Sequence, residues 1–169
     1  LILKTIIIYL IRMKKIIITG GSGFIGSNLV NYFLKKKYFV INIDKLSYSG
    51  NKYNISNIDK KNYFFIRADI NNKRIIIKTL NRFKPSVIFN LAAETHVDRS
   101  IDKPEPFILS NINGVFNLLE SIRFYNKNSK NKTKLIHVST DEVYGDILDK
   151  YKRADESYPY KPSSPYAAS

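Results

Sequence analysis

Apolar residues fall into short, mostly continuous runs and longer stretches with helical spacing, and the two kinds alternate along the chain. The short runs predict buried strands at residues 16–18, 38–43, 63–67, 87–91 and 135–139. The longer stretches predict helices over residues 24–33, over residues 71–83, and from Pro104 or Pro106 through Ile122. Strands that alternate with helices through short connections predict an α/β fold with a parallel, right-handed, doubly wound sheet.

The number of strands bears on the domain organisation. Five strands are accounted for in 169 residues, whereas a sheet of this topology is expected to have a sixth. We therefore expect residues 13–169 to form a partial domain, truncated after about five strands, with the C-terminal strands and a substrate domain missing. Residues 1–12 are expected to be an extension outside the fold. Their apolar run is shorter than the roughly 20 residues that cross a bilayer, and a membrane anchor is the less favoured alternative.

Composition narrows the class of protein. The formal net charge of +14 would suit a nucleic-acid-binding protein, but the lysines are scattered over loops and helix ends without forming a basic stripe. Nucleic-acid binding is therefore not favoured. The absence of cysteine fits a cytoplasmic protein, and the two histidines lie too far apart in sequence to suggest a metal site.

The segment Thr19–Gly26 places four glycines between the first predicted strand and the first predicted helix. It reads both as Gly21-x-Gly23-x-x-Gly26 and as Gly20-x-x-Gly23-x-x-Gly26. In this context one glycine permits the turn, a second lets the backbone approach a pyrophosphate, and a third lets the helix pack on the strand. The phosphates would lie on free N–H groups at the positive end of the helix. The pattern predicts a Rossmann-like dinucleotide-binding fold, with an ordinary glycine-rich turn as the alternative.

Asp44 ends the second predicted strand, about 20 positions after the glycine turn. An acidic residue at this place binds the adenosine ribose hydroxyls of a dinucleotide. A carboxylate accepts hydrogen bonds from both hydroxyls but repels a 2′-phosphate. Asp44 therefore favours NAD over NADP, and a solvated aspartate at a strand end is the alternative.

Several segments together give the chain a close resemblance to a known family. They are Gly20–Gly26, Asp44–Tyr48, Leu91–Ser100, Ser139–Gly145 and Ser163–Tyr166. With these segments the chain resembles the dTDP-glucose 4,6-dehydratases of the extended short-chain dehydrogenase/reductases. The resemblance runs from about Met13 to Ser169, roughly the amino-terminal half of such an enzyme. The glycine turn by itself indicates only the superfamily, whereas Thr140-Asp141-Glu142 separates sugar-nucleotide dehydratases from epimerases.

The resemblance implies an NAD-dependent dehydration of dTDP-glucose, a nucleotide sugar, to dTDP-4-keto-6-deoxyglucose. NAD would take a hydride from C4 of the sugar and return it at C6. Tyr166 would remove the O4 proton and Glu142 the C5 proton. Asp141 would protonate the departing C6 hydroxyl, with Thr140 hydrogen-bonding near O4. Asp141 and Glu142 must then hold opposite protonation states at neutral pH, and without the other motifs the pair would indicate only a solvated acidic loop.

The resemblance also assigns contacts with the cofactor and the substrate. The residues implied to bind NAD are Gly20, Gly23, Phe24, Ile25, Gly26, Asp44, Lys45, Leu46, Ser47, Asp69, Ile70, Leu91, Ala92, Ala93, Glu94, Thr95 and Ser110. Thr95 and Thr140 also match substrate-contacting positions. His96 could touch the substrate or make a structural hydrogen bond, and His137, in a predicted strand, is expected to belong to the core. No residue is implied to bind a metal.

The end of the chain departs from the family pattern. Family members place a lysine four residues after the tyrosine, one helical turn on and on the same face. Here it would be residue 170, so the tyrosine is present without the ammonium that makes it a base at neutral pH. We therefore expect an amino-terminal fragment that binds NAD and is catalytic only within the full-length enzyme. A non-catalytic NAD-binding fragment or pseudogene product, and another nucleotide-sugar dehydratase or epimerase, are the alternatives.

For the full-length protein, the family further implies a homodimer built through the long helix around residues 107–122. The sequence itself shows only an apolar helix there, which could equally belong to the core. The nucleotide base of the substrate is not readable from these residues.

Overall fold

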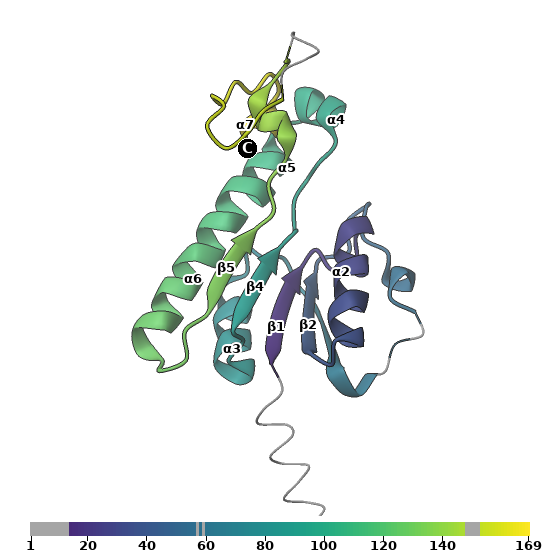
Figure 1. Ribbon diagram of the computed structural model, residues 1–169, viewed down its shortest axis with the longest axis vertical. Coiled ribbons are helices and arrows are strands. Elements are labelled where there is room, and N and C mark those ends of the chain that lie inside the picture. Colours follow the sequence, from purple (N-terminus) through teal and green to yellow (C-terminus); the bar gives the residue numbers. More distant parts are fainter. Residues whose placement is uncertain (1–13, 57, 59, 148–152) are drawn as a thin grey trace, which may run out of the picture.

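The computed structural model describes residues 14–56, 58, 60–147 and 153–169, and the extension expected at residues 1–12 lies outside this part of the chain. Five strands form one sheet: β1 (Lys15–Thr19), β2 (Phe39–Asp44), β3 (Tyr63–Arg67), β4 (Val87–Asn90) and β5 (Lys134–His137). Their order is β3-β2-β1-β4-β5, and every neighbouring pair is parallel (Figure 1). The predicted doubly wound α/β sheet is confirmed.

Helices connect the strands and cover both faces of the sheet. They are α2 (Phe24–Lys35), α3 (Lys73–Phe83), α4 (Val97–Asp102), α5 (Glu105–Phe107), α6 (Gly114–Asn128) and α7 (Pro165–Ala168). Shorter helical turns are η1 (Lys52–Asn54), η2 (Lys60–Asn62), the π-helical η3 (Ile108–Asn113) and η4 (Asp141–Tyr144). Within the described ranges, no helix combines the length and the apolar character needed to cross a membrane.

The core lies on both sides of the central strands. Ile17 of β1 packs in one cluster with Leu80 of α3 and Leu118 of α6, whereas Ile18 packs in a second cluster with Val30 of α2. All five side chains are fully buried. Successive side chains of a strand point to opposite faces, so an uninterrupted apolar strand requires a helix on each side. The carboxyl ends of β1 and its neighbours are therefore held on a rigid platform.

The long helix predicted through Ile122 is built from α5, η3 and α6. The backbone stays helical at both junctions, but η3 inserts a π-helical turn that changes which residues face the sheet. Phe107, Leu118 and Ile122 are buried, whereas Ile112 and Phe116 are 43% and 64% exposed. The apolar repeat therefore locates the helix without separating its buried face from its exposed face.

Two local features differ from the sequence-based expectations. The helix α4 is not predicted, because its residues Val97–Asp102 have no apolar repeat. His137, expected to belong to the core, is exposed. That prediction is wrong because His137 ends β5, which has a neighbouring strand on one side only in the described part of the chain.

Leu118→Ala should lower the free energy of unfolding by about 2–5 kcal/mol, because the buried side chain would leave a cavity between α6 and the sheet. Phe124→Ala is the matched control on the same helix. Its side chain is half exposed, so we expect a loss of less than about 0.5 kcal/mol. Urea unfolding of both variants measures the difference, and similar losses would contradict the assigned orientation of α6.

Candidate functional site

The glycine turn joins β1 to α2 at the centre of the sheet. Gly20 has a φ of 68°, a left-handed conformation that favours glycine. A Cβ on Gly20 would lie 2.7 Å from the carbonyl carbon of Leu91, just after β4, and a Cβ on Gly26 would overlap the carbonyl oxygen of Gly20. The backbones of β1, α2 and the loop after β4 approach one another this closely only because both side chains are absent.

The first turn of α2 is open to an anion. Its N-cap residue, Gly23, supplies no side-chain hydrogen bond, and the turn contains no acidic residue. The leading N–H groups of a helix have no intrahelical acceptor, and the helix dipole makes this end positive. Phe24 and Ile25 lie beside these groups with largely exposed side chains. The arrangement suits a pyrophosphate.

A buried polar network holds the glycine turn against β2. Asp44 is 7% exposed, and its carboxylate accepts hydrogen bonds from the N–H of Ser22 (2.9 Å) and the N–H of Leu46 (2.8 Å). The carbonyl of Ser22 accepts from the N–H of Asn51 (3.0 Å) and from Nδ2 of Asn54 (3.0 Å). Ser22 therefore ties the glycine turn both to the end of β2 and to the loop that follows β2.

Asn42 supports the same turn from within β2. Its Nδ2 donates to Oγ of Ser22 (3.1 Å) and to the hydroxyl of Tyr63 on β3 (3.0 Å), and its buried Oδ1 has no partner in the described part of the chain. Burial raises the pKa of Tyr63 above its usual value. The hydrogen bond from Asn42 opposes this rise in pKa, and the nearby charge of Asp44 adds to it. The folded chain therefore favours a neutral phenol behind the glycine turn.

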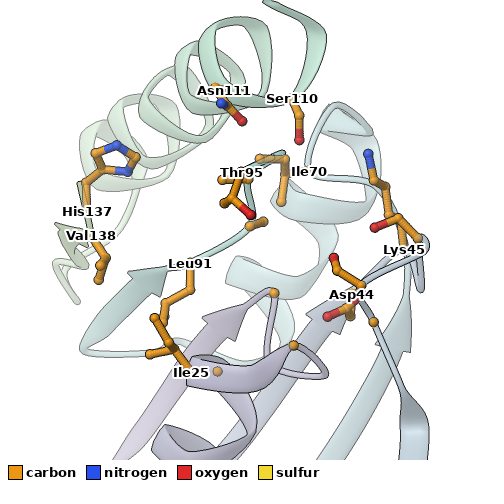
Figure 2. A pocket seen from close by; sticks show the side chains of 18 of the residues that line it. Ile25, Asp44, Lys45, Ile70, Leu91, Thr95, Ser110, Asn111, His137 and Val138 are labelled. Carbon is orange, nitrogen blue, oxygen red and sulfur yellow. The ribbon is translucent and has the colours of Figure 1, made fainter. Parts of the chain in front are cut away.

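A cavity of about 490 Å³ lies at the carboxyl ends of the strands (Figure 2). Loops that follow β2 and β4, the two neighbours of β1, supply its opposite sides. This is the point at which the strand order reverses, where open α/β sheets bind their ligands. Figure 2 shows Asp44 and Lys45 on one side, Leu91 and Ile25 near the glycine turn, and Ser110 on the far side.

Most residues predicted to bind NAD line this cavity. They are Gly20, Gly23, Phe24, Ile25, Gly26, Asp44, Lys45, Ser47, Asp69, Ile70, Leu91, Ala92, Ala93, Thr95 and Ser110. Leu46 and Glu94 do not line the cavity. Glu94 is 8% exposed, and its backbone N–H donates to Oδ1 of Asn111 (2.8 Å). A direct contact of Leu46 or Glu94 with a cofactor stays a prediction.

Two of the predicted catalytic residues, Thr140 and Tyr166, line the same cavity. The backbone N–H of Tyr166 donates to Oγ of Ser100 on α4 (3.1 Å), and its ring lies against Phe107, with 6.3 Å between ring centroids. The helix α7, which carries Tyr166, contacts α4 and η4. The unpredicted helix α4 therefore positions the tyrosine.

Asp141 and Glu142 lie beside the cavity but do not line it. Both are exposed on η4. Thr140 caps this turn by accepting the N–H of Glu142 (3.3 Å), and its hydroxyl donates to Oδ1 of Asp141 (3.4 Å). The structure brings both carboxylates next to a cavity-lining threonine, and their catalytic roles stay predictions.

The cavity also contains residues to which the sequence analysis assigns no role. They are Ile43, Ser49, Gly50, Ala68, Asn111, His137, Val138, Ser139, Val143, Ala167 and Ser169. Asn111 connects two parts of the site, because its Nδ2 donates to the carbonyl of Glu94 (2.9 Å) and to Oγ of Ser169 (2.9 Å). It lies in η3, within the helix predicted from its apolar repeat. Such a repeat does not indicate which polar residues of the helix enter a cavity. The sequence analysis includes Val138 and Ser139 in the predicted strand 135–139, whereas β5 ends at His137 and both residues follow its carboxyl end.

The two histidines have different positions. Nδ1 of His137 lies 2.9 Å from Nδ2 of Asn90, at the edge of the cavity. His96 caps α4, with its Nδ1 3.5 Å from the N–H of Arg99. Of the two roles considered for His96, the structure shows the structural hydrogen bond.

These features fit an NAD molecule. The pyrophosphate would lie against the N–H groups at the start of α2, next to the close backbone approach at Gly20. A carboxylate oxygen accepts more than one hydrogen bond. Ribose hydroxyls can therefore donate to Asp44 without displacing the N–H groups of Ser22 and Leu46. Ile70 and Leu91 offer apolar surface on either side of the cofactor.

Tyr63→Phe should make stability less sensitive to pH in the alkaline range. The folded-state pKa of Tyr63 lies above its usual value of 10.0, so its contribution to stability is complete below pH 10.0 and is lost as pH rises through the folded-state pKa. Urea unfolding between about pH 9 and pH 11 measures the loss, which should be smaller for Tyr63→Phe than for the unchanged chain. Tyr53→Phe, at a 72% exposed tyrosine, should behave like the unchanged chain. An equal loss in all three proteins would contradict the assignment.

The chain is similar to known proteins both in sequence and in structure. The chain is 45% identical over 160 residues to a probable dTDP-glucose 4,6-dehydratase of Sinorhizobium fredii (strain NGR234), a match that covers 92% of this chain and 45% of that protein. The crystal structure of dTDP-glucose 4,6-dehydratase from Bacillus anthracis in complex with NAD has a TM-score of 0.80 and 39% identity, covering 92% of this chain and 46% of that one.

An epimerase has a similar fold. The UDP-glucose 4-epimerase of Thermus thermophilus, crystallised with NAD, has a TM-score of 0.79 and 33% identity, covering 91% of this chain and 46% of that one. The chain spans about half the length of the curated relatives it matches. The family described as GDP-mannose 4,6 dehydratase matches residues 17–169, a range that includes the glycine turn, Asp44, Thr140 and Tyr166. The chain therefore belongs to the GDP-mannose 4,6-dehydratase family, and the relatives named above place the dTDP-glucose 4,6-dehydratases among its homologues.

Proposed function

We propose that this chain is the NAD-binding part of a dTDP-glucose 4,6-dehydratase, which converts dTDP-glucose to dTDP-4-keto-6-deoxyglucose. One observation carries the proposal: a single cavity is lined by the glycine turn, by Asp44, and by Thr140 and Tyr166. The glycine turn and Asp44 supply what a dinucleotide needs. Thr140 and Tyr166 supply hydroxyl groups for a sugar at the opposite end. The identity to a probable dTDP-glucose 4,6-dehydratase supports this choice of reaction.

Bound NAD would accept a hydride from the sugar and later return it. The chain's own residues would move the protons. Tyr166, held at the cavity by Ser100, would take the proton from O4, with Thr140 hydrogen-bonding to the same oxygen. Glu142 would take the C5 proton, and Asp141 would protonate the C6 hydroxyl as it leaves. Both carboxylates are exposed, which supports the proposal because a bound sugar would then be able to contact and cover them.

An epimerase is the second candidate. Two observations favour it: the similarity to the T. thermophilus epimerase, and the position of Asp141 and Glu142 outside the lining of the cavity. An epimerase needs the base at O4 but no carboxylate to remove a C5 proton. The role of Glu142 therefore separates the two reactions. A non-catalytic NAD-binding chain is the third possibility, and it predicts NAD binding without turnover.

In the whole protein, Glu142→Gln should reduce formation of the 4-keto sugar from dTDP-glucose by about 10²–10⁴-fold, the usual contribution of a general base. Binding of NAD should be unchanged, because Glu142 is exposed on η4 and lies outside the cavity lining. Product is followed by the absorbance of the keto sugar in alkali, and NAD binding by calorimetry. Glu156→Gln, at another exposed glutamate, is the control. Full activity of the Glu142 variant, or product epimerised at C4, would refute the dehydratase assignment.

We also infer that the protein forms a homodimer through the long helix. Five exposed apolar side chains on η3 and α6 lie close together in sequence: Ile108, Leu109, Ile112, Phe116 and Leu119, each between 43% and 64% exposed. Their spacing places them on one side of a continuous helical rod. An exposed apolar strip of this kind commonly marks an interface, and a two-fold axis would pair the strip with its own copy.

Phe116→Glu should convert the dimer to a monomer, because it places a charge at the most exposed apolar position of this strip. Size-exclusion chromatography with light scattering measures the mass. Lys36→Glu, at the exposed C-cap residue of α2 on the opposite face of the sheet, should leave the dimer intact. A monomeric unchanged chain, or a dimeric Phe116→Glu variant, would refute this interface.

A further inference from the structure

The end of β2 presents two neighbouring residues with opposite implications for the cofactor. Asp44 and Lys45 both line the cavity. A carboxylate at this place favours the ribose hydroxyls of NAD, whereas a nearby cation accommodates the 2′-phosphate of NADP. Lys45 is the one lysine or arginine among the cavity-lining residues of the described chain. A Lys45 ammonium without a carboxylate partner would therefore weaken the preference for NAD over NADP that Asp44 establishes.

The Lys45 ammonium is engaged by two carboxylates from other strands' loops. Its Nζ lies 3.1 Å from Oε1 of Glu94, after β4, and 3.9 Å from Oδ2 of Asp69, after β3. The Glu94 side chain is 10% exposed, against 37% for Lys45 and 41% for Asp69. The pair with Glu94 is thus the shorter and the better shielded from water. Figure 2 shows the Lys45 side chain extending away from the Asp44 carboxylate.

Glu94 is fixed in place by its own backbone. Asn111 accepts the N–H of Glu94 at its Oδ1 (2.8 Å) and donates from its Nδ2 to the carbonyl of Glu94 (2.9 Å). These two bonds hold the residue against η3. The backbone of Glu94 is thereby fixed, and its side chain, 10% exposed, reaches the Lys45 ammonium from this position.

Carboxylates outnumber the ammonium at this end of the cavity. Asp44 and Asp69 line the cavity with Lys45, and Glu94, which does not line the cavity, pairs with the Lys45 ammonium. A phosphate monoester carries a charge of about −1.5 to −2 at neutral pH. A 2′-phosphate would therefore meet net negative charge unless Lys45 were released from Glu94. The ribose hydroxyls of NAD carry no charge and meet no such barrier.

We propose that Glu94 is a specificity-determining residue, which holds the Lys45 ammonium away from the 2′-position so that the cavity accepts NAD and rejects NADP. The inference rests on the proposed binding of NAD. It gives Glu94 an indirect role in place of the direct cofactor contact expected from the resemblance. The cofactor preference then depends on an ion pair between residues from different loops, in addition to Asp44.

The test is the ratio of the dissociation constants of NADPH and NADH, measured by the fluorescence of the reduced nicotinamide. Glu94→Gln keeps the size of the side chain and removes its charge. It should lower the ratio about tenfold, with NADH affinity changed less than about twofold, since a tenfold change corresponds to one released ion pair of about 1.4 kcal/mol. Glu120→Gln is the matched control, because it breaks another ion pair, 2.7 Å from Arg123, on the outside of α6. Its ratio should not change.

A second pair of variants identifies the cation. Lys45→Met should not lower the ratio, and adding Glu94→Gln to Lys45→Met should have no further effect on it. Asp69→Asn, at the more exposed and more distant carboxylate, should lower the ratio by a smaller factor. If Glu94→Gln does not fold, Asp69→Asn still decides the question, because a lowered ratio would support the inference and an unchanged ratio would overturn it.

The failures are distinguishable. An unchanged ratio in Glu94→Gln, with or without a parallel loss of both affinities, would show a purely structural role and overturn the inference while leaving the proposed function standing. A lowered ratio that persists in the double variant would also overturn it, because Lys45 would not be the responsible group. If the unchanged chain bound neither nucleotide, the proposed NAD binding itself would fail, and the inference with it.

Discussion

The close backbone approach at the glycine turn is the constraint on which the site depends. β1, α2 and the loop after β4 meet at Gly20 and Gly26, where a Cβ has no room. A side chain on Gly20 would press on the carbonyl of Leu91 and move the β4 loop away from β1. The residues after Leu91 line the cavity, and the loop after β2 lines its other side. Without this approach the two sides would not share one crevice.

The buried polar network extends that constraint to the ribose end. Asp44 is oriented by the N–H groups of Ser22 and Leu46, so its carboxylate is positioned before any ligand arrives. Groups ordered in advance lose less conformational entropy on binding. The same serine carries the hydrogen bonds of Asn51 and Asn54, which hold the loop after β2. The glycine turn, the Asp44 carboxylate and the loop after β2 are therefore held together by one set of hydrogen bonds.

The sheet, the glycine turn and the place of Asp44 at the end of β2 could be predicted from the sequence because each depends on a local pattern. The sheet follows from apolar runs, the turn from its steric need for glycine, and the place of Asp44 from its distance to that turn. The sequence did not predict α4, whose residues have no apolar repeat and whose start is capped by His96. His137 was misplaced because an apolar run does not show whether its strand lies at an edge. The Lys45–Glu94 ion pair joins residues from different loops, and only the strand order brings them together.

The distribution of charge shows where binding free energy for a dinucleotide must come from. The chain carries a net charge of +14, yet Lys45 is the one lysine or arginine lining the described cavity, and Glu94 engages it. A pyrophosphate bound there has no free side-chain cation to pair with. It must rely on N–H groups and on the dipole at the start of α2, which act only at short range. Because those groups can reach a phosphate only where the backbone comes close, the glycines that permit the turn also determine the affinity. The scattered lysines outside can attract an anionic ligand, whereas a ligand inside the cavity would meet mainly neutral N–H groups and carboxylates.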